Sequence, residues 1–320
     1  MILVTGATGF LGAEVCKRLI EKGYSVLGIG RKQYGFLDAK TLASDRFQFL
    51  QLELKNLHNE SLANIANCAP RACIHLASMV EYASSDYHDY HDYHDYHDYH
   101  DYTITPTINL INLAQHLQIK KIIYSSTSSV IAKPSPTQQT SDENTPISPM
   151  SNYGLSKYVC EKLLELATLK TPTLSCIALR FPAIYGRNHL GGIIHTLKEQ
   201  ILHHQEVELY GRGKYLRNVL FVSDAVDAII LALESELSGY ELFTIGASES
   251  LSVLEIAQHL INLTHSRSHL ILSAKESPNN FNAQLDTSKA QRMLGYTPRS
   301  IESGLKDYIA TLDSPQKDPS

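Results

Sequence analysis

A tyrosine and a lysine lie four residues apart at Tyr153 and Lys157, a spacing that puts both side chains on one face of a helix. A free tyrosine has a pKa of about 10, and a neighbouring ammonium favours its ionised form. Tyr153 could therefore exchange a proton as an acid or a base near neutral pH. Because Tyr-x-x-x-Lys arises often by chance, the meaning of this pair depends on the residues that accompany it.

A run of hydroxyl side chains stands upstream of this pair. Residues 121–125 read as a buried strand that ends in Ser125, and Ser126 and Thr127 follow directly. A hydroxyl at the carboxyl edge of a parallel sheet can hydrogen-bond a substrate oxygen. The sequence therefore predicts a substrate oxygen held beside Tyr153.

A glycine-rich loop follows the first apolar run of the chain. Gly6, Gly9 and Gly12 recur every three residues between an expected strand and an amphipathic helical stretch. Glycines at such a turn let backbone N–H groups approach a pyrophosphate at the helix N-terminus. The spacing G-x-x-G-x-x-G differs from the usual G-x-G-x-x-G, but its place in a strand–turn–helix unit predicts a dinucleotide site.

The second expected strand ends in two cations, Arg31 and Lys32. An acidic residue at this distance from the glycine loop binds the ribose 2′-hydroxyl of NAD, whereas a cation favours the 2′-phosphate of NADP. Both residues could instead be ordinary solvated charges at a strand end. The cofactor is therefore predicted to be NAD or NADP, with a slight preference for NADP.

Strands and helices must alternate to position these residues. Short β-branched runs at 2–4, 25–29, 47–52, 72–76, 121–125 and 174–179 predict strands, and apolar spacing predicts helices at 11–22, 107–117, 153–169, 191–204, 222–235 and 252–263. This pattern predicts an α/β fold with a doubly wound parallel sheet (Rossmann) and a smaller C-terminal α+β substrate lobe. We expect residues 1–185 to form the dinucleotide-binding domain, with return segments near 215–248, and residues 186–320 to form mainly the lobe.

Composition excludes several classes of protein. The chain has 320 residues, 43% hydrophobic and 19% charged, with a formal charge of −5, no apolar run long enough to span a membrane and no basic patch for nucleic acid. The five cysteines include no Cys-x-x-Cys pair, which argues against a disulfide framework and a zinc site, so we expect no bound metal. No secretory signal precedes the first expected strand, and a cytoplasmic enzyme is therefore expected.

A repeated tract accounts for the acidity. Residues 86–102 repeat Asp-Tyr-His five times and end in Asp-Tyr, and without them the chain carries 28 basic and 27 acidic residues. On an α-helix a period of three drifts around the axis, so no single face collects the tyrosines. We expect an insert that is partly helical and exposed at the edge of the lobe or at a subunit rim.

Taken together, these motifs resemble the extended short-chain dehydrogenase/reductase family, in its NAD(P)-dependent branch of nucleotide-sugar epimerases and dehydratases. The resemblance extends over about residues 1–300 and includes segments 5–12, 74–77, 122–130, 153–157, 179–186, 217–224 and 285–296. It implies a dinucleotide cofactor, a nucleotide-sugar substrate and a homodimer.

The resemblance also assigns roles to residues. It makes Tyr153 the base, Thr127 the catalytic hydroxyl, and Lys157 the group that lowers the pKa of Tyr153 and holds the nicotinamide ribose. The expected cofactor residues are Gly6, Thr8, Gly9, Phe10, Leu11, Gly12, Arg31, Lys32, Glu53, Leu54, Leu76, Ala77, Ser125, Tyr153, Lys157 and Pro182. The expected substrate residues are Ser126, Thr127, Ala183 and Arg217, the last gripping a phosphate.

Departures from the family pattern narrow the reaction. Dehydratases carry Asp-Glu after the catalytic hydroxyl, whereas this chain has Ser128 and Ser129, so dehydration is disfavoured. Ala183 replaces a common asparagine, Thr103 occupies another asparagine position, and residues 275–281 lack the usual Arg-Pro-Gly-Asp. These last differences affect the nucleotide half of the substrate more than the redox chemistry.

We therefore expect an NAD(P)-dependent epimerase. Tyr153 would take the proton of a sugar hydroxyl while hydride leaves the carbon, and the keto intermediate would then receive hydride on its other face. A keto-sugar or other carbonyl reductase would use the same groups once, with Tyr153 as the acid. A non-catalytic dinucleotide sensor on the same fold is the third alternative.

Overall fold

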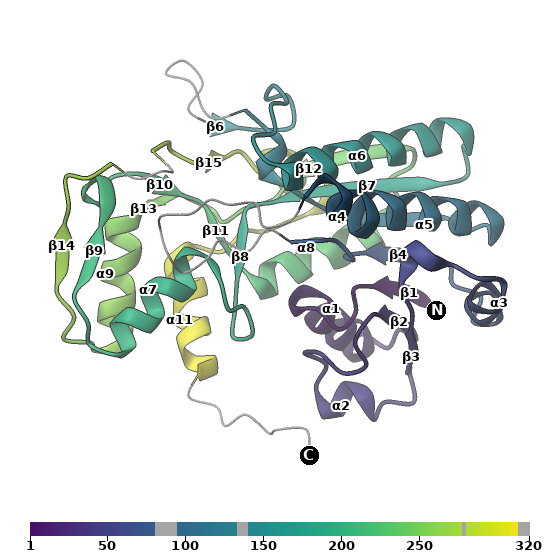
Figure 1. Cartoon of the computed structure of the whole chain (residues 1–320), viewed down its shortest axis with the longest axis horizontal. Helices are drawn as coiled ribbons and strands as arrows, with labels where there is room; N and C mark the ends of the chain where they lie inside the picture. The colour runs from purple at the N-terminus through teal and green to yellow at the C-terminus, as the bar shows by residue number, and fades with distance from the viewer. Residues whose placement is uncertain (81–94, 133–139, 277–279, 313–320) are drawn as a thin grey trace.

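The centre of the molecule is a parallel sheet of seven strands (Figure 1). The computed structural model describes residues 1–80, 95–132, 140–276 and 280–312. The strands lie in the order β3 (Phe47–Gln51), β2 (Val26–Gly30), β1 (Ile2–Thr5), β4 (Ala72–His75), β5 (Lys121–Thr127), β7 (Ser175–Phe181) and β12 (Tyr240–Thr244). This is the strand order of a doubly wound dinucleotide-binding sheet with one further strand at its edge, and it confirms the predicted fold class.

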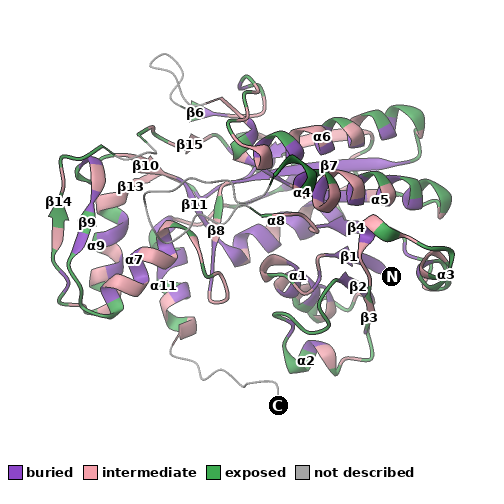
Figure 2. Cartoon of the chain, viewed as in Figure 1, coloured by how far each residue is buried: buried purple, intermediate pink, exposed green. Residues whose placement is uncertain are grey.

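Side chains alternate between the two faces of this sheet, and both faces are covered. Ile2 and Val4 of β1 pack on one side with α1 (Phe10–Glu21), α8 (Val222–Glu234) and α10 (Ser288–Leu294). Leu3 packs on the other side with α3 (Asn59–Asn67), α5 (Thr105–His116) and α6 (Asn152–Lys170). Burial on both faces explains why these strands are continuous apolar runs (Figure 2).

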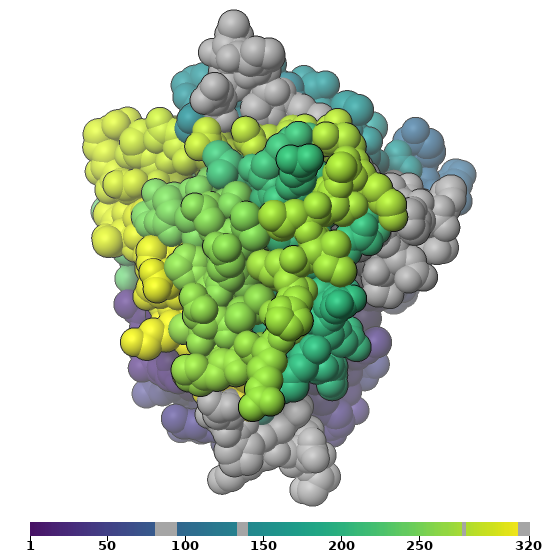
Figure 3. Space-filling view, turned by 90° about the vertical axis from the view of Figure 1, so that its left-hand side faces the viewer, coloured from purple at the N-terminus to yellow at the C-terminus, as the bar shows by residue number. Residues whose placement is uncertain are grey.

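A smaller part of the structure follows Pro182, and its green to yellow residues form most of the face seen in Figure 3. Its apolar core joins α7 (Gly192–Leu202), α9 (Val253–Thr264) and α11 (Ile301–Leu312) to short strands β8 (Ala183–Tyr185), β9 (Val207–Leu209) and β11 (Val219–Phe221). Further two-residue and three-residue strands pair nearby: β10 (Leu216–Arg217) with β13 (Leu251–Ser252), β14 (Leu270–Leu272) with β9, and β15 (Gln284–Leu285) with β6 (Thr140–Ser141). Between these elements the chain returns to the large sheet through α8 and β12.

The remaining short elements lie around the sheet. They are α2 (Ala39–Leu42), α4 (Tyr96–Tyr99), η1 (Leu54–Asn56), η2 (His100–Ile104), η3 (Ser128–Val130) and η4 (Tyr210–Gly213). Each predicted strand or helix is present, with ends within two residues of the predicted ones. In the part of the chain that the structure describes, no helix combines the length and apolar character that a membrane crossing requires.

The end of the Asp-Tyr-His tract runs continuously into α5. Residues 96–116 pass through α4, the π-helical turn η2 and α5, and the Thr105 N–H donates to the His100 carbonyl five residues earlier. This wider turn lies directly before Pro106. Because proline has no backbone N–H, Pro106 cannot donate the α-helical hydrogen bond to the carbonyl four residues earlier. Tyr99 is only 2% exposed, so the prediction of an exposed insert is wrong for this residue. Residues 86–94 of the tract lie outside the described residues.

A chain of hydrogen bonds ties the end of β4 to β1 and α5. The Thr107 hydroxyl donates to the Thr103 carbonyl at 2.8 Å, so the Thr107 oxygen accepts from His75 Nε2 at 3.0 Å. His75 Nδ1 then accepts from the Thr5 hydroxyl at 2.7 Å. Burial, aided by the charge of Lys157, lowers the pKa of His75 to about 3, and the imidazole is therefore neutral. Every polar atom of this interior histidine has a partner.

We predict that His75→Leu lowers the free energy of unfolding by about 1–3 kcal/mol, because Thr5 and Thr107 lose their partner in the interior. Urea denaturation at pH 7.5 measures this loss. His58→Leu, at an exposed position, is the matched control and should stay within about 0.5 kcal/mol of the parent.

The same histidine gives a predicted pH dependence. The unfolded chain binds a proton at His75 below its ordinary pKa of 6.5, whereas the native state resists protonation down to a pKa of about 3. The contribution of His75 is therefore complete above about pH 6.5 and is lost as the pH falls toward 3, by about 1.4 kcal/mol per pH unit. An equal acid slope in the parent and in His75→Leu would contradict this assignment.

Candidate active site

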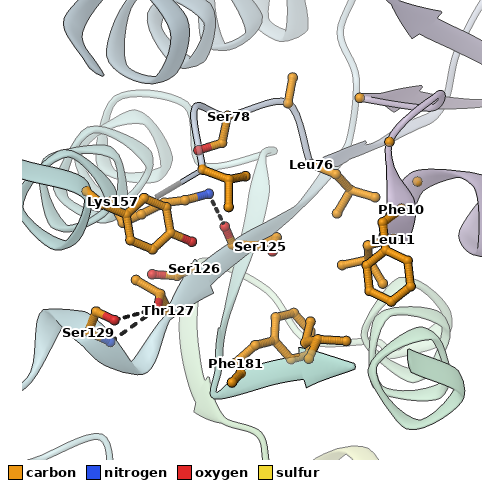
Figure 4. Close-up of a pocket in the computed structure, with 18 of the residues that line it drawn as sticks. Phe10, Leu11, Leu76, Ser78, Ser125, Ser126, Thr127, Ser129, Lys157 and Phe181 are labelled. Carbon is orange, nitrogen blue, oxygen red and sulfur yellow. Dashed lines mark hydrogen bonds between the residues drawn. The ribbon is translucent and has the colours of Figure 1, made fainter. Parts of the chain in front are cut away.

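A cleft of about 1880 Å³ opens at the carboxyl ends of β1, β2, β4, β5 and β7. Every residue that the sequence singled out for a site lies on its wall: Gly6, Thr8, Gly9, Phe10, Leu11, Gly12, Arg31, Lys32, Glu53, Leu54, Leu76, Ala77, Ser125, Ser126, Thr127, Tyr153, Lys157, Pro182, Ala183 and Arg217. Figure 4 shows Phe10 and Leu11 on one side, and Lys157, Ser125 and Thr127 on the other. The structure thus brings the predicted residues together, while their individual roles remain predictions.

The glycine loop is determined by close backbone approaches. Gly6 has a φ of +69°, and a Cβ on it would lie 2.8 Å from the Ala77 nitrogen. A Cβ on Gly12 would lie 2.0 Å from the carbonyl oxygen of Gly6. Helix α1 starts immediately after Gly9, has no acidic residue in its first turn, and leaves its first N–H groups without acceptors inside the helix. This arrangement suits a diphosphate at the helix N-terminus.

Lys157 is a buried ammonium. Its side chain is 3% exposed, and its Nζ donates to the Ser125 carbonyl at 2.8 Å, the contact drawn in Figure 4. The Nζ lies 5.8 Å from the centre of the Tyr153 ring and 5.0 Å from that of Tyr124. Burial lowers the pKa of Lys157 to about 8, against the opposing effects of Cys160 and Glu161. The ammonium is therefore held beside the tyrosine while remaining close to losing its proton.

Thr127 ends β5 and caps the turn η3. Its hydroxyl donates to the Ser129 hydroxyl at 3.2 Å and accepts from the Ser129 N–H at 3.1 Å (Figure 4). A Cβ on Gly154 would lie 2.5 Å from the Ser129 carbonyl oxygen, so α6 begins in direct contact with this turn. Ser151 caps α6 by accepting from the Gly154 N–H at 3.2 Å. This contact brings Tyr153 to the side of the cleft that holds Thr127. The glycine that follows Tyr153 in the sequence allows the close approach.

Ser126 has a protein partner that the sequence did not predict, and its substrate role stays a prediction. Its hydroxyl, which the sequence assigned to the substrate, donates to Glu161 Oε1 at 2.5 Å. Glu161 also accepts from Arg180, at 2.9 Å from Nε and 2.7 Å from Nη2, and both charged side chains are at most 3% exposed. Helix α6, strand β5 and strand β7 therefore meet at one bidentate ion pair. Sequence reasoning missed this pair, because Glu161 and Arg180 lie on different elements and no local pattern links them.

The substrate side of the cleft is formed by β8 and β10. Ala183 is exposed at the start of β8, next to Pro182. Arg217 Nη1 donates to the carbonyls of Leu216 and Phe281, at 2.7 Å and 2.6 Å, and the guanidinium lies 5.4 Å from the centre of the Phe281 ring. The arginine expected to grip a phosphate is thus oriented by the protein before any ligand binds.

Thr103, at the family's asparagine position, organises the segment after β4. It is fully buried, and its hydroxyl oxygen accepts from the Met79 N–H at 3.1 Å and lies 3.3 Å from the Ser78 hydroxyl. Ser78 lies on the wall of the cleft beside Ala77. The hydroxyl therefore orders the backbone that borders the cleft.

The chain is similar to known proteins along most of its length. Residues 2–246 match the model of the NAD dependent epimerase/dehydratase family. An uncharacterized UDP-glucose epimerase of Bacillus subtilis is 30% identical, over 98% of each chain, and a putative UDP-glucose 4-epimerase of Methanocaldococcus jannaschii is 26% identical, over 97% of each.

Solved structures agree with the family model. The UDP-glucose 4-epimerase of Thermotoga maritima with UDP-glucose is 26% identical, with a TM-score of 0.81 over 98% of this chain and 99% of that one. The UDP-glucuronic acid 4-epimerase of Bacillus cereus with UDP-glucuronic acid and NAD is 27% identical, with a TM-score of 0.81 over 97% and 99%.

We predict that Arg180→Met lowers the free energy of unfolding by about 3–5 kcal/mol, because it leaves the Glu161 carboxylate buried without its partner. The double variant Glu161→Leu/Arg180→Met should lose less than Arg180→Met alone, as measured by urea denaturation. Additive losses in the double variant would contradict the coupling.

An exposed pair on the same helix provides the control. Glu165 accepts from Lys162 at 2.7 Å, and both side chains are more than one third exposed. Glu165→Gln should change the free energy of unfolding by less than about 1 kcal/mol, because solvent screens this pair.

Proposed function

The chain belongs to the NAD dependent epimerase/dehydratase family, and on that premise we propose that it epimerises a nucleotide-linked sugar through a transient keto intermediate, with Tyr153 as the base. The observation that supports this proposal is the arrangement of Tyr153, Lys157 and Thr127 on one side of a cleft whose other side is the glycine loop. A proton-transfer group thus faces the place where a dinucleotide fits.

The cleft fits a dinucleotide together with a substrate. Its volume of about 1880 Å³ exceeds the roughly 300–1,000 Å³ of an ordinary small-molecule pocket. Gly6 and Gly12 give the diphosphate access to backbone N–H groups, and Glu53 and Leu54 lie where the adenosine half would bind. NAD bound there would accept hydride from the sugar carbon and return it.

Side chains of the protein accept and return the proton of the sugar hydroxyl. Tyr153 takes the proton of the sugar hydroxyl as the carbonyl forms, and returns it when the hydroxyl is restored. The Lys157 ammonium, held by Ser125, stabilises the phenolate across the 5.8 Å to the ring. Thr127, held by the Ser129 N–H, would turn its hydroxyl proton from the Ser129 oxygen to the same sugar oxygen. These groups return to their starting state after each turnover, as an epimerase requires.

Dehydration finds no support in this site. Ser128 and Ser129 replace the acid and base that a dehydratase needs, and Ser129 is engaged by Thr127. NADPH-dependent reduction of a keto-sugar would use Tyr153 once as an acid, and the cations Arg31 and Lys32 are the observation that keeps this alternative open.

We take NAD as the cofactor. The Bacillus cereus relative holds NAD, and the preference for NADP predicted from Arg31 and Lys32 has no support among these relatives. UDP-glucose and UDP-glucuronic acid are the first substrates to test, because the relatives named above bind them. The homodimer and the cytoplasmic location stay predictions.

Tyr153→Phe should lower kcat by about 10²–10⁴-fold, the usual contribution of a positioned acid–base group, while NAD affinity stays within about threefold. Coupled assays of epimer formation measure kcat, and titration calorimetry measures the affinity. Tyr158→Phe, on the same helix but away from the cleft, is the matched control and should retain full activity. Undiminished turnover of Tyr153→Phe would refute the role of this tyrosine.

The net change in NADH or NADPH during turnover distinguishes an epimerase from a reductase. With a nucleotide sugar and catalytic amounts of NAD, we expect product epimer without net change in absorbance at the NADH wavelength. Stoichiometric consumption of NADPH with a keto-sugar, in the absence of epimer formation, would replace the proposal by the reductase alternative.

A further inference from the structure

We propose that Tyr102, the last tyrosine of the Asp-Tyr-His tract, sets the preference of this site for NAD over NADP by holding Arg31 and Lys55 against its ring. This inference rests on the proposed dinucleotide site but not on the epimerase reaction. It gives the tract a role that neither its composition nor the family resemblance assigns.

Tyr102 lies where three separate segments meet at the wall of the cleft. Lys55 Nζ is 4.1 Å from the centre of the Tyr102 ring, and Arg31 Cζ is 4.9 Å from it. Both distances are within the roughly 6 Å range of cation–π attraction. Asp101, the preceding residue of the tract, accepts from Lys55 Nζ at 3.3 Å. Tyr102, Arg31 and Lys55 border the cleft, whereas Asp101 does not.

Arg31 occupies the position that governs cofactor choice. It is the first residue after β2, from which a side chain meets the 2′ position of the adenosine ribose. A guanidinium that is available there would bind the 2′-phosphate of NADP. Contact with Tyr102 holds the Arg31 guanidinium against the ring. Binding of the 2′-phosphate would require the guanidinium to leave the ring.

Local carboxylates reinforce this effect. Asp101 beside Lys55 and Glu53 on the cleft wall both disfavour the additional negative charge of a 2′-phosphate. Arg31 and Lys32 are both exposed at this strand end, and the contacts with the Tyr102 ring involve Arg31 and Lys55. The tract therefore acts on Arg31, one of the two cations that favour NADP in the sequence, and on Lys55.

The tract places its three described tyrosines, Tyr96, Tyr99 and Tyr102, in different surroundings. On an α-helix a step of three residues turns the side chain by about 60°, as from Tyr96 to Tyr99, and the step to Tyr102 enters the wider π-helical turn η2, where the rotation per residue differs. Tyr96 is 71% exposed, Tyr99 is 2% exposed with its ring 6.4 Å from that of Tyr153, and Tyr102 borders the cleft. Identical residues thus meet three different environments, and Tyr96 provides a matched control.

The test compares the dissociation constants of NADH and NADPH, measured by fluorescence with the full-length protein. Tyr102→Leu, which removes the ring but keeps an apolar side chain, should shift the affinity ratio toward NADPH by about five- to tenfold. Tyr102→Phe, which retains the ring, should retain the preference for NADH. Tyr96→Leu should leave the ratio within about twofold of the parent. If Tyr102→Leu does not fold, Tyr102→Gln replaces it.

A double variant identifies the group responsible. Arg31→Gln introduced into Tyr102→Leu should remove most of the gain in NADPH affinity, because the released guanidinium is gone. An unchanged ratio in Tyr102→Leu, or an equal shift in Tyr96→Leu, would overturn the proposal. A gain that survives Arg31→Gln would also overturn it. A shift in the ratio together with absent epimerase activity would refute the proposed reaction and support this inference.

Discussion

The buried ion pair between Arg180 and Glu161 is the interaction on which the geometry of the cleft depends. An unpaired charge in that interior is strongly destabilising, so α6 is held at the rotation and height where Glu161 meets both Arg180 on β7 and Ser126 on β5. Lys157 and Tyr153 precede Glu161 by four and eight residues on the same helix, so the three side chains leave it within an arc of about 80°. Holding Glu161 inward therefore directs the tyrosine and the lysine toward the strand ends that carry the hydroxyl groups.

The parallel sheet supplies the second constraint. Strands β1, β4, β5 and β7 run in the same direction and in register, so their carboxyl ends lie along one edge. Gly6 and Gly12 let the backbone after β1 approach the segment after β4, and the hydrogen bonds of His75 hold these two strand ends together. The site thus depends on neutral hydrogen bonds at one end of the cleft and on a buried charge pair at the other. Substitutions at His75 or Glu161 therefore change the positions of the residues that border the cleft, although neither residue is assigned a role in the reaction.

Much of the fold and of the site could be predicted from the sequence, because both have local signals. Alternating apolar periods located the strands and helices, and the glycine loop, the hydroxyl run and the Tyr-x-x-x-Lys pair all stand at strand ends or helix starts. What the sequence did not show concerns residues whose surroundings depend on distant partners. Ser126 has the same residue type as its neighbours, yet its hydroxyl turns to Glu161, 35 positions later. The tract has a period that selects no face, so its sequence could not show that Tyr99 is buried.

The sequence by itself determined the class of fold, the place of the glycine loop and the residue types that line the cleft. These properties depend on hydrophobic period and on spacing within one segment, which a linear pattern records. The tertiary structure alone decided which charges are exposed, which are paired and which lie against a ring. Arg31 illustrates the difference: in the sequence it is a cation at a strand end, and in the fold it lies against Tyr102, 71 positions later. Electrostatic effects depend on distance and burial in space, and the order of residues along the chain does not fix either of them.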